Sequence, residues 1–209
     1  MKNVNELLFE KQSATITIWI KRGGIAMKKA AVLLADGFEE IEALTAVDLL
    51  RRARIYVDTI SISDDYMVAG SHGINVQTED LFDEVEFAEF DMLVLPGGMP
   101  GTTNLEAHPG VRKVVKEFCE SGKYVGAICA APSILGNMGL LKGKRAICYP
   151  SFEDKLAGAV LVKAPVVQDG NIITSRGMGT AIDFGLKLVE VLSDKLKADE
   201  VAESIIYLK

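Results

Sequence analysis

The sequence predicts an α/β protein in which helices cover both faces of a doubly wound, mostly parallel β-sheet. Short apolar runs alternate with amphipathic stretches along most of the 209 residues, which is the order expected of successive βαβ units. Apolar residues make up 49% of the chain but aromatic residues only 7%, a composition that suits strands buried on both faces. The length fits one domain.

Apolar runs bounded by turn residues predict the strands. Alanine, valine and leucine fill the first run, and a Pro-Gly-Gly turn ends the third at residues 96–98. The expected strands are residues 28–35, 55–62, 91–95, 123–129, 145–148, 160–163 and 171–174.

Helical periodicity predicts the connecting elements. The first expected helix, residues 39–52, has an apolar inner face made of Ile41, Leu44, Val47, Leu49 and Leu50. The helix at 109–120 has a proline in its first turn, and His108 or a neighbouring residue is expected to cap it. Further helices are predicted at 130–138, 181–192 and 197–206, with a helical turn at 152–156.

Composition also narrows the function classes. The formal charge is −6 and there is no basic block, so nucleic acid is not an expected partner. The three cysteines, at 119, 129 and 148, have neither the spacing of a zinc site nor that of a disulfide framework. We therefore expect no metal and a reducing, cytoplasmic location.

Residues 1–26 differ from the rest of the chain. Their apolar stretch at 14–20 is too short to span a bilayer, so no membrane association is expected. Glu6 and Glu10 precede it where a signal peptide would be positive. We interpret 1–26 as an extension, either an edge arm or a non-native start, and 27–209 as the domain.

Cys129 is the sharpest chemical signal in the chain. It lies where the strand at 123–129 turns into the next helix, between the small residues Ala127 and Ala131. This is the pattern of a nucleophile elbow, in which strand and helix backbones approach closely. Helix N-terminal N–H groups favour a thiolate, so a lowered pKa is expected. Cys119 and Cys148 are interpreted as packing residues, although Cys148 is also a candidate for redox chemistry beside Cys129.

A nucleophile needs a proton partner, and neither histidine, His72 nor His108, directly follows a core strand. The acids Glu39, Glu40 and Glu42 follow the first strand, at the same sheet edge as Cys129. Two of them would complement the helix dipole, and the third would turn inward, with a raised pKa.

Backbone groups complete the expected site. Gly97 and Gly98 end a neighbouring strand, and their N–H groups would stabilise an oxyanion together with that of Ala130. No phosphate-binding loop or dinucleotide fingerprint is present.

Four segments together resemble the ThiJ/PfpI family of the class I glutamine amidotransferase-like superfamily: residues 35–42 (ADGFEEIE), 95–98 (LPGG), 127–132 (AICAAP) and 174–180 (TSRGMGT). The chain is most similar to the branch of the parkinsonism-associated protein deglycase and the bacterial YajL-like proteins. The resemblance implies a flavodoxin-like α/β/α sandwich, a homodimer and no cofactor. It implies that Cys129 is the oxidation-sensitive nucleophile, that Glu42 is its hydrogen-bonding partner, and that Gly97, Gly98 and Ala130 give backbone contacts.

Three positions depart from relatives in the family. Tyr149 stands where some members have a histidine beside the cysteine, and it remains a candidate hydrogen-bond donor. Ala130 stands where the protease branch has a histidine, which argues against peptidase activity. His72 falls where relatives carry an arginine near the dimer contact. His72, Tyr149 and Arg176 are therefore candidate pocket residues.

The resemblance implies a cysteine-dependent glyoxalase or deglycase with a stress-protective role. Its substrates would be methylglyoxal, glyoxal or their early adducts with protein side chains. One alternative is an oxidative-stress sensor or redox chaperone without physiological turnover. Another is thiazole monophosphate biosynthesis, an activity attached to such sequences that no motif here supports directly.

Overall fold

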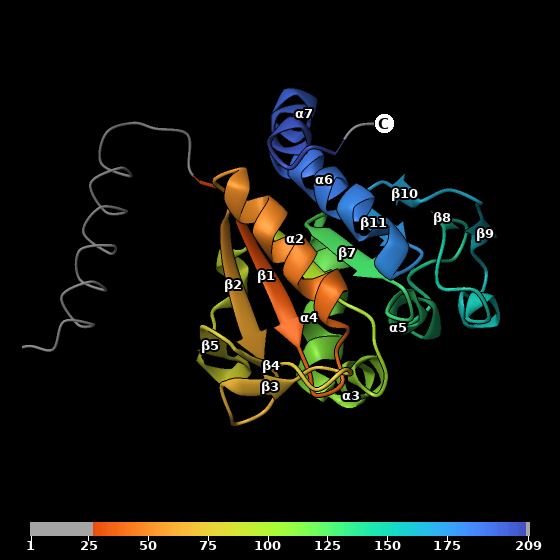
Figure 1. The fold of residues 1–209 in the computed structure, drawn as a ribbon. Coiled ribbons are helices and arrows are strands. Elements are labelled where there is room, and N and C mark those ends of the chain that lie inside the picture. Colours follow the sequence, from red (N-terminus) through yellow and green to blue (C-terminus); the bar gives the residue numbers. More distant parts are fainter. Residues whose placement is uncertain (1–26, 208–209) are drawn as a thin grey trace, which may run out of the picture.

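The computed structural model describes residues 27–207 and confirms the predicted α/β sandwich (Figure 1). A seven-stranded sheet has the order β10-β11-β7-β6-β1-β2-β5. All neighbouring strands in it are parallel except β10 and β11. The strands are β1 (Lys29–Leu34), β2 (Tyr56–Ser61), β5 (Asp80–Leu81), β6 (Met92–Leu95), β7 (Tyr124–Ile128), β10 (Val166–Asp169) and β11 (Ile172–Ser175).

Helices cover both faces of this sheet. One core contains Ala30, Val32 and Leu34 of β1, packed with residues of α2 (Glu40–Arg52), α6 (Ala181–Leu192) and α7 (Lys195–Ser204). The alternate β1 residues, Ala31 and Leu33, pack with α3 (Gly101–Ala107), α4 (Pro109–Ser121) and α5 (Pro132–Asn137) on the opposite face. This period of two explains why β1 is apolar throughout, since both of its faces are buried.

Several elements differ from the sequence prediction. The expected strand at 145–148 is the short β8 (Arg145–Ala146), which pairs with β9 (Val160–Leu161) outside the main sheet. Not predicted were α3, β5, β10 and the hairpin of β3 (Met67–Ala69) and β4 (Asn75–Gln77). Single 3₁₀ turns occupy Phe82–Glu84, Phe87–Glu89, Glu153–Lys155 (the helical turn expected at 152–156) and Met178–Thr180 (η4). The unpredicted pieces are short, and short elements have little periodicity to detect.

The predicted inner face of α2 is wrong at two positions. Ile41 is 50% exposed and Leu44 is 37% exposed, whereas Val47, Leu49 and Leu50 are buried as expected. The first turn of the helix buries Glu40 and Glu42 in their place. Polar partners in the adjoining loops, described below, make the burial of these two carboxyl groups possible.

The sheet order brings three loops together. In the sheet, β2 lies on one side of β1 and β6 lies on the other, with β7 next to β6. The carboxyl ends of β1, β6 and β7 are therefore neighbours. Such a reversal leaves a crevice beyond the carboxyl ends of the strands. The backbone N–H of Glu39 donates to the Gly97 carbonyl at 2.9 Å, which joins the first two of these loops.

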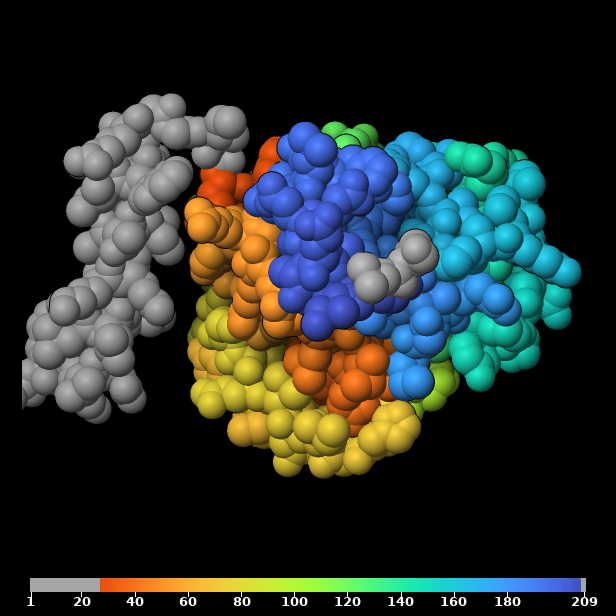
Figure 2. All heavy atoms as spheres, turned by 45° about the horizontal axis from the view of Figure 1, so that its top comes forward, coloured from red at the N-terminus to blue at the C-terminus, as the bar shows by residue number. Residues whose placement is uncertain are grey.

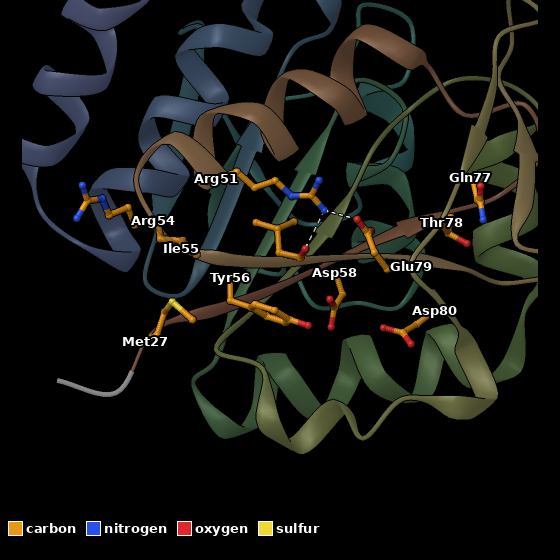
Figure 3. Close-up of a pocket in the computed structure, with 11 residues that line it drawn as sticks. Met27, Arg51, Arg54, Ile55, Tyr56, Asp58, Gln77, Thr78, Glu79 and Asp80 are labelled. Carbon is orange, nitrogen blue, oxygen red and sulfur yellow. Dashed lines mark hydrogen bonds and ion pairs between the residues drawn. The ribbon is translucent and has the colours of Figure 1, made fainter. Parts of the chain in front are cut away.

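The outer edge of β2 has a cavity of about 830 Å³ (Figure 3). Arg51 donates to the Val57 carbonyl, and Glu79 accepts from the backbone N–H of Thr59, where β5 does not reach. These side chains satisfy backbone groups that would otherwise pair with another strand. Asp58 also faces this cavity, and burial raises its pKa, as do the nearby Asp80 and Glu79. Neither Cys129 nor Glu42 lines it, so the cavity is separate from the site predicted from the sequence.

No helix among residues 27–207 combines the length and the apolar character needed to cross a membrane. The predicted extension at 1–26 lies outside the described residues.

Candidate active site

Cys129 lies at the sharp turn between β7 and α5, as the sequence predicts. Its φ is +64°, a left-handed conformation that is uncommon for a residue with a side chain. Its backbone N–H donates to the Ser175 carbonyl at 3.0 Å, and its carbonyl accepts from the Tyr149 N–H at 2.8 Å. Two neighbouring segments therefore hold this conformation, which places the half-buried thiol at the crevice.

Glu42 is the acid that turns inward. It is 1% exposed, and its Oε2 accepts from the backbone N–H of Gly97 at 2.9 Å. The Met178 N–H and the Cys129 thiol also lie beside this carboxyl group and lower its pKa. A Cβ atom on Gly97 would lie 2.6 Å from both the Cys129 Cβ and the Glu42 Oε2. Only glycine therefore allows the thiol and the carboxyl group to approach across this loop.

Burial governs the electrostatics of the pair. It raises the pKa of Glu42 to about 7, against hydrogen bonds from Cys129 and from backbone N–H groups that lower it. It also raises the pKa of Cys129 to about 12, and the ionised Glu42 carboxylate contributes to that rise. The expected lowering of the Cys129 pKa is therefore wrong while Glu42 is ionised. The N–H groups of Ala130, which precedes α5, and of Gly98 lower the pKa of the thiol, but they do not outweigh burial and a neighbouring negative charge.

The two groups are close enough to titrate as a pair. We predict that alkylation of Cys129 by iodoacetamide rises with pH in two steps. The first step, near pH 7, removes one proton from the pair and leaves a fraction of molecules with a thiolate beside a protonated Glu42. The second step lies in the strongly alkaline range. Alkylation rates from pH 5 to 11, followed by intact mass, cover the first step and the beginning of the second. A single step near the free-thiol pKa of about 8.5 would show that Glu42 and Cys129 titrate independently.

The three backbone groups predicted to line the site have different roles. The N–H groups of Gly98 and Ala130 point at the Cys129 sulfur and lower its pKa. The Gly97 N–H is bound to Glu42, so its expected place in an oxyanion site is wrong. Gly98 has a φ of +90°, and a Cβ there would lie 2.4 Å from the backbone nitrogen of Glu39. Two donors, Gly98 and Ala130, therefore remain available beside the sulfur.

The three candidate pocket residues lie at different distances from this pair. Tyr149 borders the site, because Gly177 lies between its ring and Glu42. A Cβ atom on Gly177 would be 3.3 Å from the Tyr149 ring and 3.8 Å from the Glu42 Oε1. Arg176 is exposed and forms no hydrogen bond or ion pair with any residue in the range 27–207. His72 binds Glu40 instead of facing Cys129, with its Nδ1 2.8 Å from the Glu40 Oε2.

Glu40 is buried beneath the loop between β3 and β4. Its Oε1 accepts from the His72 backbone N–H at 2.7 Å, and its Oε2 from the Ser71 hydroxyl at 3.3 Å. Burial alone would raise the Glu40 pKa, but the hydrogen bonds from His72 and from backbone N–H groups outweigh it, so the pKa falls to about 2. Glu40 thus anchors the β3–β4 hairpin beside the site. The sequence places it correctly in a first turn but does not reveal this partner, which is 32 residues away.

Glu39, Glu40 and His72 have potential ligand atoms within 4.8 Å of one another. The His72 nitrogen and the Glu40 oxygens are already bonded to each other, so we assign no metal to this group.

The other two cysteines pack in the core on the opposite face of the sheet from the core that Cys129 contacts. Cys148 is 1% exposed and belongs to the core on the α4 side, which is consistent with packing. Cys119 is only partly buried on α4, and burial raises its pKa to about 11.

Fold and site together define a doubly wound α/β protein with a cysteine at a strained elbow and a buried glutamate beside it. Comparison with known proteins agrees: residues 28–191 match the DJ-1/PfpI family. The chain belongs to this family, which confirms the resemblance seen in the sequence.

Relatives across several kingdoms support this assignment. The protein DJ-1 homolog B of Arabidopsis thaliana is 40% identical over 86% of the chain, although the chain spans only 41% of that relative. The glutathione-independent glyoxalase DJ-1 of Schizosaccharomyces pombe is 33% identical, with 86% of the chain and 98% of the relative covered.

Solved structures agree with the fold. A variant of a DJ-1 superfamily protein from Salmonella typhimurium is 41% identical, with a TM-score of 0.84, covering 88% of this chain and all of that one. An oxidised DJ-1 from Toxoplasma gondii has the same TM-score at 36% identity and covers 87% of this chain and all of that one.

Proposed function

We propose that this protein converts methylglyoxal or glyoxal to the corresponding hydroxy acid without a cofactor, using Cys129 as nucleophile and Glu42 as proton carrier. The observation that carries the proposal is the contact between the half-buried thiol and a carboxyl group whose pKa is about 7. A group with that pKa can both accept and donate a proton near neutrality. The glyoxalase name of the Schizosaccharomyces pombe relative points the same way.

The reaction starts when the Cys129 sulfur adds to the aldehyde carbon and a proton goes to the aldehyde oxygen, which gives a hemithioacetal. Glu42 removes the hydrogen from that carbon, and the resulting enediol takes a proton at the adjacent carbon. The product is a thioester of lactate or glycolate. Water hydrolyses the thioester and restores the thiol. Electrons move only within the substrate, so the net change is the addition of one water.

The remaining groups fit this sequence of steps. The Gly98 and Ala130 N–H groups, which point at the sulfur, would stabilise the oxyanions formed on the carbon bound to it. In an early adduct with a protein side chain the aldehyde carbon is already a hemiaminal or hemithioacetal. The Cys129 sulfur would replace the side chain at that carbon, and the side chain would leave with a proton as the free amine or thiol. The later steps would be the same, which is the deglycase activity. The test is lactate formation from methylglyoxal without glutathione, with the purified full chain.

A second role, as a cytoplasmic sensor of oxidants in a stress response, is favoured by the oxidised state of the Toxoplasma gondii relative. The half-buried sulfur is flanked by two N–H donors and a carboxyl group that can be protonated, a setting that suits an oxidised cysteine. Mild peroxide should then add two oxygens selectively at Cys129, as read by peptide mass. Unmodified Cys129 in the presence of oxidised Cys119 would count against sensing.

We also propose that the protein forms a homodimer through the face beside the site. Ile41, Leu44, Ile74 and Met178 are all between 37% and 56% exposed. The start of α2, the β3–β4 hairpin and the segment before α6 form adjoining parts of one face (Figure 2). Ile74 lies beside Glu40, and Met178 lies beside Glu42, so both are near the helix that carries Ile41 and Leu44. A second copy would cover them.

This dimer predicts that Ile41→Glu is monomeric. A charge placed in an apolar interface loses its hydration without gaining a partner, so association should weaken at least about 100-fold. Sedimentation velocity measures the mass. The control is Leu196→Glu, since Leu196 is an exposed apolar residue on α7. A wild-type chain that sediments as a monomer at high concentration would contradict the dimer.

A further inference from the structure

Glu39, the residue directly before α2, carries another carboxyl group, and this group has no role in the proposed reaction. Glu39 caps the helix: its Oε2 accepts from the Glu42 backbone N–H at 2.7 Å. Its own N–H donates to the Gly97 carbonyl at 2.9 Å, while the Gly97 N–H donates to Glu42. Glu39 is therefore bonded both to the residue that carries the reactive carboxyl group and to the loop that holds it.

We propose that Glu39 is a positioning residue that fixes the Glu42 side chain against Cys129 and places a negative charge beside its carboxyl group. The inference rests on the proposed function, because it assigns a second acid to the same site. Glu39 itself does not need to contact a substrate to act in this way.

Glu39 has two effects on Glu42, and a substitution can separate them. As an acceptor it holds the first turn, from which Glu42 reaches Gly97 and Cys129. As a charge it faces Glu42 and helps to raise the pKa of that carboxyl group. Glutamine keeps the acceptor and removes the charge, so Glu39→Gln isolates the electrostatic effect.

Among the groups around Glu42, Glu39 is the one that acts on it as a nearby charge. The elbow contributes the Cys129 thiol, and the segments after β6 and β11 contribute the backbone N–H groups of Gly97 and Met178. His72 is hydrogen-bonded to Glu40 through its Nδ1, and this bond raises the pKa of His72. His72 is therefore already matched by Glu40, which leaves the charge of Glu39 to act on Glu42.

The direction of the effect follows from the shared proton. When the Glu39 charge is removed, Glu42 ionises more readily, so the first proton leaves the pair at lower pH. It then leaves mostly from Glu42, and fewer molecules have a thiolate on Cys129. In Glu39→Gln the first step of the alkylation profile should fall by about 0.5 to 1 pH unit, and the rate between the two steps should fall by about 3- to 10-fold.

The experiment measures the alkylation profile of Cys129 in the full chain, together with methylglyoxal turnover. Glu39→Asp keeps both the charge and the cap, so its profile should resemble the wild type. Glu86→Gln is the matched control, because Glu86 caps a 3₁₀ turn through the Ala88 N–H at 3.4 Å and lies before β6, at the end opposite Gly97. If Glu39→Gln does not fold, Glu39→Asn replaces it, since asparagine is an uncharged residue favoured at this position.

An unchanged first step in Glu39→Gln, or a shift of equal size in Glu86→Gln, would overturn the positioning role. The turnover assay separates this failure from that of the proposed function. A profile that shifts as expected in a chain without methylglyoxal turnover would leave Glu39 as a positioning residue and remove the enzymatic proposal.

Discussion

Cys129→Ser is expected to reduce the conversion of methylglyoxal to lactate by at least about 1,000-fold. A serine hydroxyl has a far higher pKa than a thiol, and Glu42, with a pKa of about 7, is too weak a base to deprotonate it at neutral pH. The rest of the site should persist, because the two backbone hydrogen bonds of the elbow do not involve the side chain. The fold is therefore expected to remain.

Lactate formation with enzymatic detection measures the loss, and circular dichroism checks the fold. Cys119→Ser is the matched control: it removes another partly buried thiol, on α4, and should retain full turnover. Undiminished turnover in the Cys129 variant would remove the nucleophilic mechanism. Equal losses in both variants would show a general dependence on thiols instead of a role for the elbow.

Glu42→Gln is expected to make the protein more stable and nearly inactive. Its carboxyl group has a pKa of about 7 in the folded chain against 4.5 as its ordinary value. Between these two values the folded state binds more protons than the unfolded state, so wild-type stability falls as pH rises from 4.5 through 7. Glutamine has no charge to bury, and its oxygen can still accept from Gly97. Above pH 7 the variant should gain about 3 kcal/mol, at 1.36 kcal/mol for each pH unit.

Urea unfolding at pH 5 and pH 8 tests the direction of this change in stability. The stabilities of the wild type and the variant should differ little at pH 5 and most at pH 8. Turnover in the variant should fall at least about 100-fold, because glutamine cannot accept the proton. Glu117→Gln, on the exposed surface of α4, should change stability by less than about 0.5 kcal/mol. A variant that is less stable than the wild type at pH 8 would mean that the ionised carboxylate stabilises the fold. A gain in stability with a loss of activity would instead show that Glu42 serves the reaction at a cost to the stability of the fold.

The long periodic elements could be predicted from the sequence. The apolar run of β1, the helices α2, α4 and α6, and the turn at Cys129 all follow from local patterns that the tertiary structure does not override. The β3–β4 hairpin could not be predicted, because its strands are three residues long and its position depends on Glu40. Likewise, Ile41 and Leu44 match a helical period yet are exposed, since the period does not say what covers a face.

The sequence by itself determined the order of the long strands and helices, the cysteine at the corner and the set of acids that could serve it. Only the tertiary structure decided among those acids. Glu39, Glu40 and Glu42 lie within four residues of one another, and all are suited to a first helical turn. Their roles diverge because their carboxyl groups have different partners. Glu39 accepts from the Glu42 backbone N–H and Glu40 from the hairpin at His72, whereas Glu42 accepts from Gly97 and lies beside Cys129. The pKa values of the Glu40 and Glu42 carboxyl groups depend on those distant partners and on burial, which no local pattern contains.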